Sequence, residues 1–80
     1  MKPAEIKKVA ETYDLDTLRQ AEEDITEEKG LSIEVGGEDE GEQLTHILAA
    51  IWIREQMYKN GTDVKTELRN YTQRVRTSIN

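Results

Sequence analysis

The sequence predicts an all-α or nearly all-α fold, a small four-helix domain in which the third helix is the central buried element. Apolar residues recur at helical spacing in four segments, and turn or cap residues separate these segments. The only long apolar block runs from Gln43 to Tyr58, and its centre, residues 47–53, holds no charged side chain. A helix this apolar needs neighbours on two sides. We therefore expect the other helices to pack around it.

Length and composition favour one domain over residues 1–80 that depends on helix packing or on self-association. A chain of 80 residues buries only about 60–65% of its unfolded surface, and domains of this size often need a further stabilising device. The sequence has no Cys and one His, which excludes a disulfide and disfavours a structural zinc site. We expect no cofactor.

The first helix is expected from about Pro3 to Tyr13. Pro suits the first helical position because the amide of that position has no partner within the helix. Four apolar residues share one face of this helix. They are Ile6, Val9, Ala10 and Tyr13.

The second helix is expected to begin after Asp14 as N-cap and to stop at Lys29 and Gly30, a C-terminal cation and a left-handed stop. Its apolar stripe consists of Leu15, Leu18, Ala21 and Ile25. Its other faces are acidic, with Glu22, Glu23, Asp24, Glu27 and Glu28. Such a run usually forms a solvated helix face, and the alternative is an acidic surface that docks a partner.

The segment from Leu31 to Val35 alternates apolar and polar residues, which is strand spacing. No second strand is evident in the chain, so we expect one short extended segment here. Two alternatives stay open. The segment pairs with its own copy in a second subunit, or it is a connector that places Leu31, Ile33 and Val35 over the core.

The third helix is expected to start at a capping box formed by Asp39 and Glu42 and to run to about Lys59, where Asn60-Gly61 is a stop signal. The fourth helix follows a cap at Thr62 or Asp63 and runs to near Ser78. Its apolar stripe is narrow. It consists of Val64, Leu68, Tyr71, Val75 and Ile79.

One apolar side of the third helix is predicted to be a subunit interface. The first apolar side consists of Leu44, Ile47, Leu48, Ile51 and Tyr58, and the second lies roughly opposite. The predicted interface consists of His46, Ala49, Ala50, Trp52, Ile53 and Met57. We therefore expect a homodimer formed around this helix. For Trp52, core packing is the favoured interpretation, and a partly exposed interface anchor is the alternative.

Glu42 and His46 are the residues that suggest chemistry. They stand four positions apart and share a helix face, so they form either two metal ligands or an acid–base pair. Two ligands are too few for a metal site, although a symmetric dimer would supply four. No nucleophile accompanies His46, because Thr45 points about 100° away along the helix. We predict no metal site and no catalytic residue, with a metal-dependent or acid–base activity at Glu42 and His46 as the alternative.

Charge is unevenly distributed along the chain. The net charge is −6, with five basic against fourteen acidic residues up to Ile53 and six against three after it. An acidic total disfavours general affinity for nucleic acid. A weak nucleic-acid contact through the last helix stays an alternative, carried by its basic residues. These are Lys65, Arg69, Arg74 and Arg76.

Nothing in the sequence indicates export or membrane insertion. The N-terminal segment, Met1 to Ile6, lacks the apolar region and cleavage site of a signal peptide. No stretch approaches the ~20 apolar residues that span a bilayer. We expect a cytoplasmic protein that does not contact membranes.

The run Gly41 to Ile53, with Gly37 to Glu40 before it and Tyr71 to Arg76 after it, resembles a family of small uncharacterised bacterial proteins of about this length. The resemblance extends over nearly the whole chain. It implies a free-standing cytoplasmic bacterial protein and assigns no activity and no functional residue.

Together these observations predict a non-enzymatic protein of the interaction, adaptor or regulatory class. It is expected to be a homodimer that offers an acidic surface to a protein partner of unknown identity.

Overall fold

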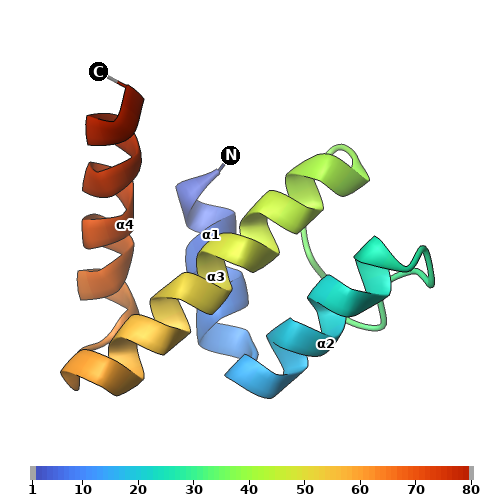
Figure 1. Cartoon of the computed structure of the whole chain (residues 1–80), viewed down its shortest axis with the longest axis horizontal. Helices are drawn as coiled ribbons and strands as arrows, with labels where there is room; N and C mark the ends of the chain where they lie inside the picture. Colours follow the sequence, from blue (N-terminus) through green and yellow to red (C-terminus); the bar gives the residue numbers. More distant parts are fainter. Residues whose placement is uncertain (1, 80) are drawn as a thin grey trace.

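Four helices make up the fold in the computed structural model of the chain, which describes residues 2–79 and the side chains of residues 2–76. They are α1 (Pro3–Thr12), α2 (Leu15–Thr26), α3 (Glu40–Asn60) and α4 (Val64–Ile79). α3 contacts each of the other three helices, and α1 also contacts α4. Figure 1 shows α3 crossing in front of α1, with α2 and α4 on its two sides. The prediction of an all-α fold with the third helix at its centre is confirmed.

The core forms where the apolar faces of α1, α2 and α4 meet α3. Ile6, Val9 and Ala10 of the predicted α1 stripe are buried, whereas Tyr13 follows the helix and is partly buried. Leu18 of α2 is fully enclosed. The buried apolar residues form one cluster that consists of Ile6, Val9, Ala10, Leu18, Ala21, Ile25, Val35, Ile47, Ala49, Ala50, Ile51, Ile53 and Val64. α3 contributes five of these thirteen residues. The side chain of Ile79, expected on the α4 stripe, lies outside the described residues.

Side-chain caps fix the starts of three helices as predicted. Asp14 accepts a hydrogen bond from the Thr17 amide at 2.8 Å, and this bond holds the pKa of the Asp14 carboxyl below its usual value. Asp39 caps α3 in the same way through the Glu42 amide, also at 2.8 Å. Asp63, one of the two predicted caps, accepts from the Thr66 amide at the start of α4.

The end of α2 differs from the prediction. The helix ends at Thr26, and the left-handed residue is Glu28, with φ 58°, rather than Gly30 alone. The Lys29 amide donates to Asp24 O at 2.8 Å and the Glu28 amide to Ile25 O at 3.1 Å. This pair of bonds is a Schellman motif, which satisfies the last carbonyls of the helix. It places a residue with a Cβ where glycine is favoured.

Residues 31–35 form an irregular connector and no strand, with a bend at Ser32 and Ile33. The expected extended segment is therefore not found, and the connector alternative agrees with the structure. Val35 is buried, while Leu31 and Ile33 pack against the core cluster. Backbone groups that a neighbouring strand would otherwise bind need another partner, and at Glu34 a side chain supplies it. The hydroxyl of Tyr13 accepts from the Glu34 amide at 3.1 Å and lies 3.2 Å from its carbonyl, to which it donates.

Arg54 of α3 completes the last turn of α1. Its Nε donates to Ala10 O at 2.7 Å, and its Nη2 lies 3.4 Å from Glu11 O. The carbonyls at a helix end have no partner within the helix, and a cation there also suits the helix dipole. The two helices are thus joined by a charge-assisted contact at the edge of the core.

Candidate functional site

His46 is fully buried, and both of its ring nitrogens are bound to backbone groups. Nδ1 lies 2.8 Å from Gly36 O, and Nε2 lies 3.0 Å from the Lys2 amide nitrogen. An amide can only donate and a carbonyl can only accept. The ring is therefore the neutral tautomer with its proton on Nδ1. The ring thus donates to the Gly36 carbonyl through Nδ1 and accepts from the Lys2 amide through Nε2.

The same network continues to α1 through Gly36. The Gly36 amide donates to Oε2 of Glu5 at 3.1 Å, so a single residue of the connector binds α3 through its carbonyl and α1 through its amide. A Cβ added to Gly36 would lie 2.5 Å from Oε1 of Glu5. Glycine allows the Glu5 carboxylate to approach the backbone this closely.

Glu42 also has a structural partner. Its Oε1 accepts from the Glu38 amide at 2.8 Å, which is a capping box shifted by one residue from the predicted return to Asp39. This amide, and the positive charge of Lys2, hold the pKa of the Glu42 carboxyl below its usual value. Within the described residues, no three His, Cys, Asp or Glu side chains gather as a metal site would require.

The predicted interface lies mostly inside the folded chain. His46, Ala49, Ala50 and Ile53 are each 0% exposed, because the other helices pack around α3. Met57 is partly buried against the core. Two folded copies cannot meet through the four enclosed residues, so this part of the prediction is wrong for the folded chain. Trp52, like Met57, is partly exposed and packs against the core cluster.

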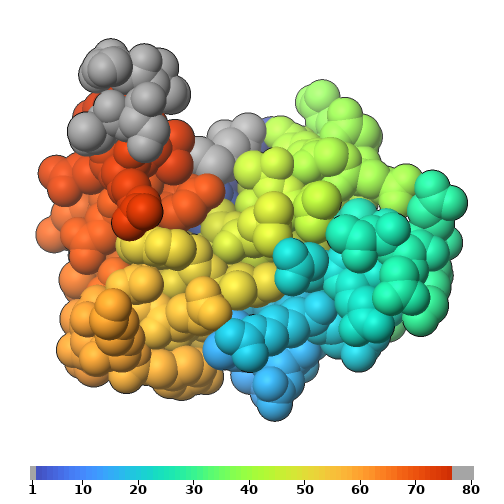
Figure 2. Space-filling view, viewed as in Figure 1, coloured from blue at the N-terminus to red at the C-terminus, as the bar shows by residue number. Residues whose placement is uncertain are grey.

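The exposed apolar side of α3 is a row of three residues at four-residue spacing, Leu44, Leu48 and Trp52, which we call the outer strip. Leu48 is 44% exposed, and the other two are partly buried. Figure 2 shows α3 open along the middle of this face, between α4 and α2. One exposed Leu is ordinary on a protein surface. A continuous row on the central helix is typical of a surface that becomes covered.

An aromatic and cationic cluster borders the outer strip on the α4 side. The ring centroids of Trp52 and Tyr71 are 5.6 Å apart and inclined by 55°, a favourable geometry for two aromatic rings. The Arg74 guanidinium lies 5.8 Å from the Trp52 centroid, within the range of a cation–π contact. This border of the strip is therefore positively charged.

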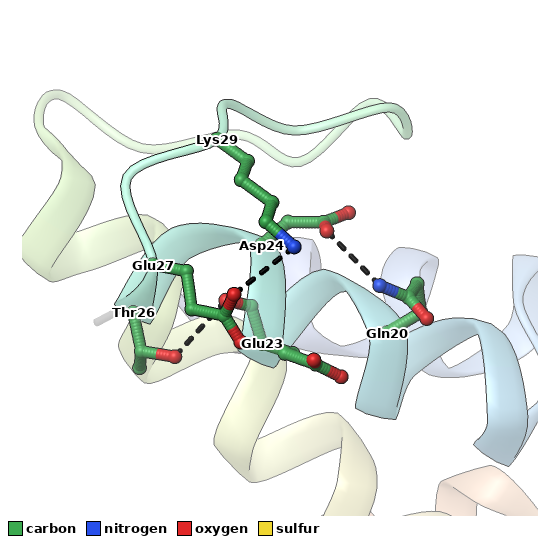
Figure 3. Close-up of polar contacts among 6 residues, drawn as sticks. All are labelled: Gln20, Glu23, Asp24, Thr26, Glu27 and Lys29. Carbon is green, nitrogen blue, oxygen red and sulfur yellow. Dashed lines mark hydrogen bonds and ion pairs between the residues drawn. The ribbon is translucent and has the colours of Figure 1, made fainter.

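The α2 side of the outer strip is acidic. A shallow groove between α2 and α3 is lined by Arg19, Glu22, Glu23, Thr26, Ile51 and Glu55. Arg19 pairs with Glu55 at 2.9 Å, which leaves an excess of negative charge from Glu22 and Glu23. At the end of α2, Glu27 pairs with Lys29 at 3.0 Å and Asp24 accepts from Gln20 (Figure 3). Glu27 and Asp24, near the end of α2, thus each have a partner close in the sequence.

The acidic and basic helices do not neutralise each other within the chain. α2 and α4 lie on opposite sides of α3 and make no helix contact with each other. The molecule carries one acidic flank and one basic flank, with the outer strip between them.

Sequence reasoning missed Glu67, a carboxylate that is only 1% exposed. It accepts from the Thr62 hydroxyl at 2.5 Å, from Asn60 at 3.4 Å and from Asn70 at 3.3 Å. The Thr62 hydroxyl, followed by the two amides, lowers the pKa of this carboxyl. Its position at the α3–α4 corner, among three short polar residues, is the signal that could have revealed it.

Residues 2–79 contain no helix that combines the length and apolar character needed to cross a bilayer. Among protein families, residues 1–80 match DUF6952, described as a family of unknown function. No curated protein and no solved structure matches the chain. The match agrees with the resemblance found in the sequence, while the bacterial origin stays a prediction. Since the match extends over the whole chain, the protein belongs to the DUF6952 family.

Proposed function

We propose that this protein is a non-enzymatic interaction protein that works as a homodimer, with the outer strip of α3 as the dimer interface. The observation that carries the proposal is the exposed Leu48 on the central helix, in one row with Leu44 and Trp52. The dimer leaves the rest of the acidic α2 surface open to a protein partner.

Charge complementarity supports a second copy as the occupant of the strip. In a two-fold dimer the same surface patch of both copies forms the interface, and the two patches run in opposite directions. The α2 flank of one copy, with Glu22 and Glu23, then lies against the α4 flank of the other, with Arg74. Each flank therefore faces the opposite charge across the interface. Aromatic and Arg side chains such as Trp52 and Arg74 are also enriched among residues that dominate binding energy.

The packing of His46 favours this function over the metal or acid–base alternative. An imidazole whose two nitrogens both bind backbone groups has no lone pair for a metal and no proton to exchange with a substrate. Glu42 accepts from a backbone amide as part of a helix cap. Both residues therefore support the fold at the start of α3.

Light scattering after gel filtration tests the proposal. The wild-type protein should have the mass of a dimer at pH 8, unchanged by zinc, and the mass of a monomer after Leu48→Asp. Tyr58→Asp is the matched control, because Tyr58 lies on the same helix and is 61% exposed, about 15 Å away along the axis. This variant should stay dimeric. Circular dichroism checks that each variant is folded.

A charge exchange makes the test specific for the arrangement of the two copies. Glu22→Lys with Glu23→Lys should weaken the dimer, and adding Arg74→Glu should restore part of it. A wild-type protein that stays monomeric at millimolar concentration contradicts the proposal. A dimer that survives Leu48→Asp shows that the copies meet through another surface.

A further inference from the structure

A second groove lies on the other side of α4, away from the outer strip. It has a volume of about 450 Å³ and is lined by Pro3, Lys65, Leu68, Arg69, Thr72, Gln73 and Arg76. The other five α4 residues follow Lys65 by three, four, seven, eight and eleven positions, which places all six on one face of the helix. Pro3, at the start of α1, forms the opposite wall. Arg74 lies on another side of α4, over Trp52.

The groove combines an apolar base with a row of cations. Leu68 and Pro3 are its apolar residues, and Lys65, Arg69 and Arg76 are its cations. Lys65 and Arg69 are exposed, and among the described residues neither takes part in an ion pair. No acidic residue lines the groove. The acids of α2 are separated from it by the width of the molecule (Figure 1).

We propose that this groove binds an acidic amphipathic helix of a partner protein. The three cations follow one another at rises of about 6 and 10 Å along α4. A helix laid alongside α4 offers carboxylates at the same rises when its acidic residues stand four and seven positions apart. An apolar side chain on the same face of that helix then packs on Leu68 and Pro3. Helix-in-groove docking with ionic pairs at the rim is a common mode of peptide recognition.

The composition of the groove favours a peptide over a nucleic acid. None of the lining residues is aromatic, whereas proteins that bind single strands stack bases on aromatic side chains. The net charge of −6 opposes a long phosphate backbone, which interacts with the whole surface. A short acidic helix interacts mainly with the nearby cations, because salt screens charges beyond about 10 Å.

Fluorescence anisotropy with a labelled synthetic peptide tests the proposal on the full chain. The probe is an Ala-rich helical peptide with Glu residues four and seven positions apart and one Leu on the same face. A matched peptide carries Gln in place of each Glu. We expect the Glu peptide to bind, the Gln peptide to bind at least about tenfold more weakly, and added salt to weaken binding.

Two matched double variants locate the site. Lys65→Glu with Arg69→Glu should reduce affinity for the Glu peptide by about tenfold or more, since two attractions become repulsions. Lys8→Glu with Lys29→Glu changes the net charge equally, on exposed residues outside the groove, and should bind like the wild type. Equal loss in both variants would show a general charge effect and overturn the proposal. If the variant with Lys65→Glu and Arg69→Glu does not fold, the milder variant with Lys65→Gln and Arg69→Gln replaces it in the binding measurement.

Two further outcomes would also overturn the proposal that the groove binds an acidic helix. Tighter binding of a labelled single-stranded DNA than of the Glu peptide would assign the groove to nucleic acid. Loss of the homodimer in the Lys65→Glu, Arg69→Glu variant, with the dimer intact after Leu48→Asp, would show that the occupant is a second copy of this chain. The proposal does not depend on the homodimer, because a monomer presents the same groove.

Discussion

The backbone amide of Lys2 donates a hydrogen bond of 3.0 Å to Nε2 of His46, 44 residues further along the chain. The other nitrogen of the ring binds Gly36 O. One buried imidazole therefore joins the start of α1, the connector after α2 and the first half of α3. A residue that suggested chemistry in the sequence is a junction of three chain segments in the structure.

Replacing His46 with Leu should lower the free energy of unfolding by about 2–4 kcal/mol, because the Gly36 carbonyl and the Lys2 amide lose their partner. Urea denaturation followed by circular dichroism measures the change. His46→Gln keeps a donor and an acceptor and should cost less. A Leu variant as stable as the wild type would show that these two bonds do not support the fold.

Glu67→Gln should destabilise the protein at pH 7 and lose this effect in acid. The pKa of Glu67 is lowered in the folded state, first by the Thr62 hydroxyl. A lowered folded pKa means that the carboxylate stabilises the fold above its unfolded pKa, about 4.3, and that this contribution disappears as the pH falls through the folded pKa. The difference in melting temperature between the two proteins, measured from pH 7 to pH 3, should therefore shrink as the pH falls below about 4.3. A constant difference over this range would contradict the linkage.

Glu28→Gly should stabilise the protein by about 1 kcal/mol, because a left-handed conformation costs a residue with a Cβ roughly 1–2 kcal/mol. For a domain of this size the melting temperature rises by roughly 4–8 °C. Glu27→Gly is the control. Glu27 has φ −96° and an ion pair with Lys29, so glycine should bring no gain there. Equal effects at both positions would show that loss of acidic charge is the cause.

Gly37→Ala should destabilise the protein by about 1–3 kcal/mol. Gly37 has φ 150°, and an added Cβ would lie 2.9 Å from the backbone nitrogen of Gln43, which α3 holds in place. Gly30→Ala provides the comparison, since Gly30 also has positive φ, 78°, but open space around it. The difference between the two variants in urea denaturation measures the steric contribution. Equal losses would mean that the backbone at Gln43 can move.

The helices could be predicted because their signals are local. Asp14, Asp39 and Asp63 each accept a hydrogen bond from an amide three residues away. α3 ends at Asn60, and Gly61, with φ 64°, is its left-handed C-cap. The apolar stripe of α1 likewise follows from spacing alone. These features depend on neighbours in the sequence, which a single chain reveals.

The side of α3 that stays exposed could not be predicted, because it depends on contacts between distant segments. Spacing shows that α3 has two apolar sides, but the packing of the other helices on α3 decides that Ala49 and Ile53 are enclosed and Leu48 is not. The partners of His46 stand 10 and 44 positions away. At the end of α2, the amides of Glu28 and Lys29 make the Schellman hydrogen bonds, so the helix ends before Gly30 is reached.

The order of the helix contacts has a consequence for slow motions of the chain. α1, α3 and α4 contact one another in a closed set, whereas α2 contacts only α3 among the four helices. Opening α2 therefore breaks one helix interface, and opening any other helix breaks at least two. Amides of α2 should exchange with deuterium through a partial opening that leaves the other three helices folded. Such an opening would release the acidic helix alone and leave the contacts among α1, α3 and α4 in place.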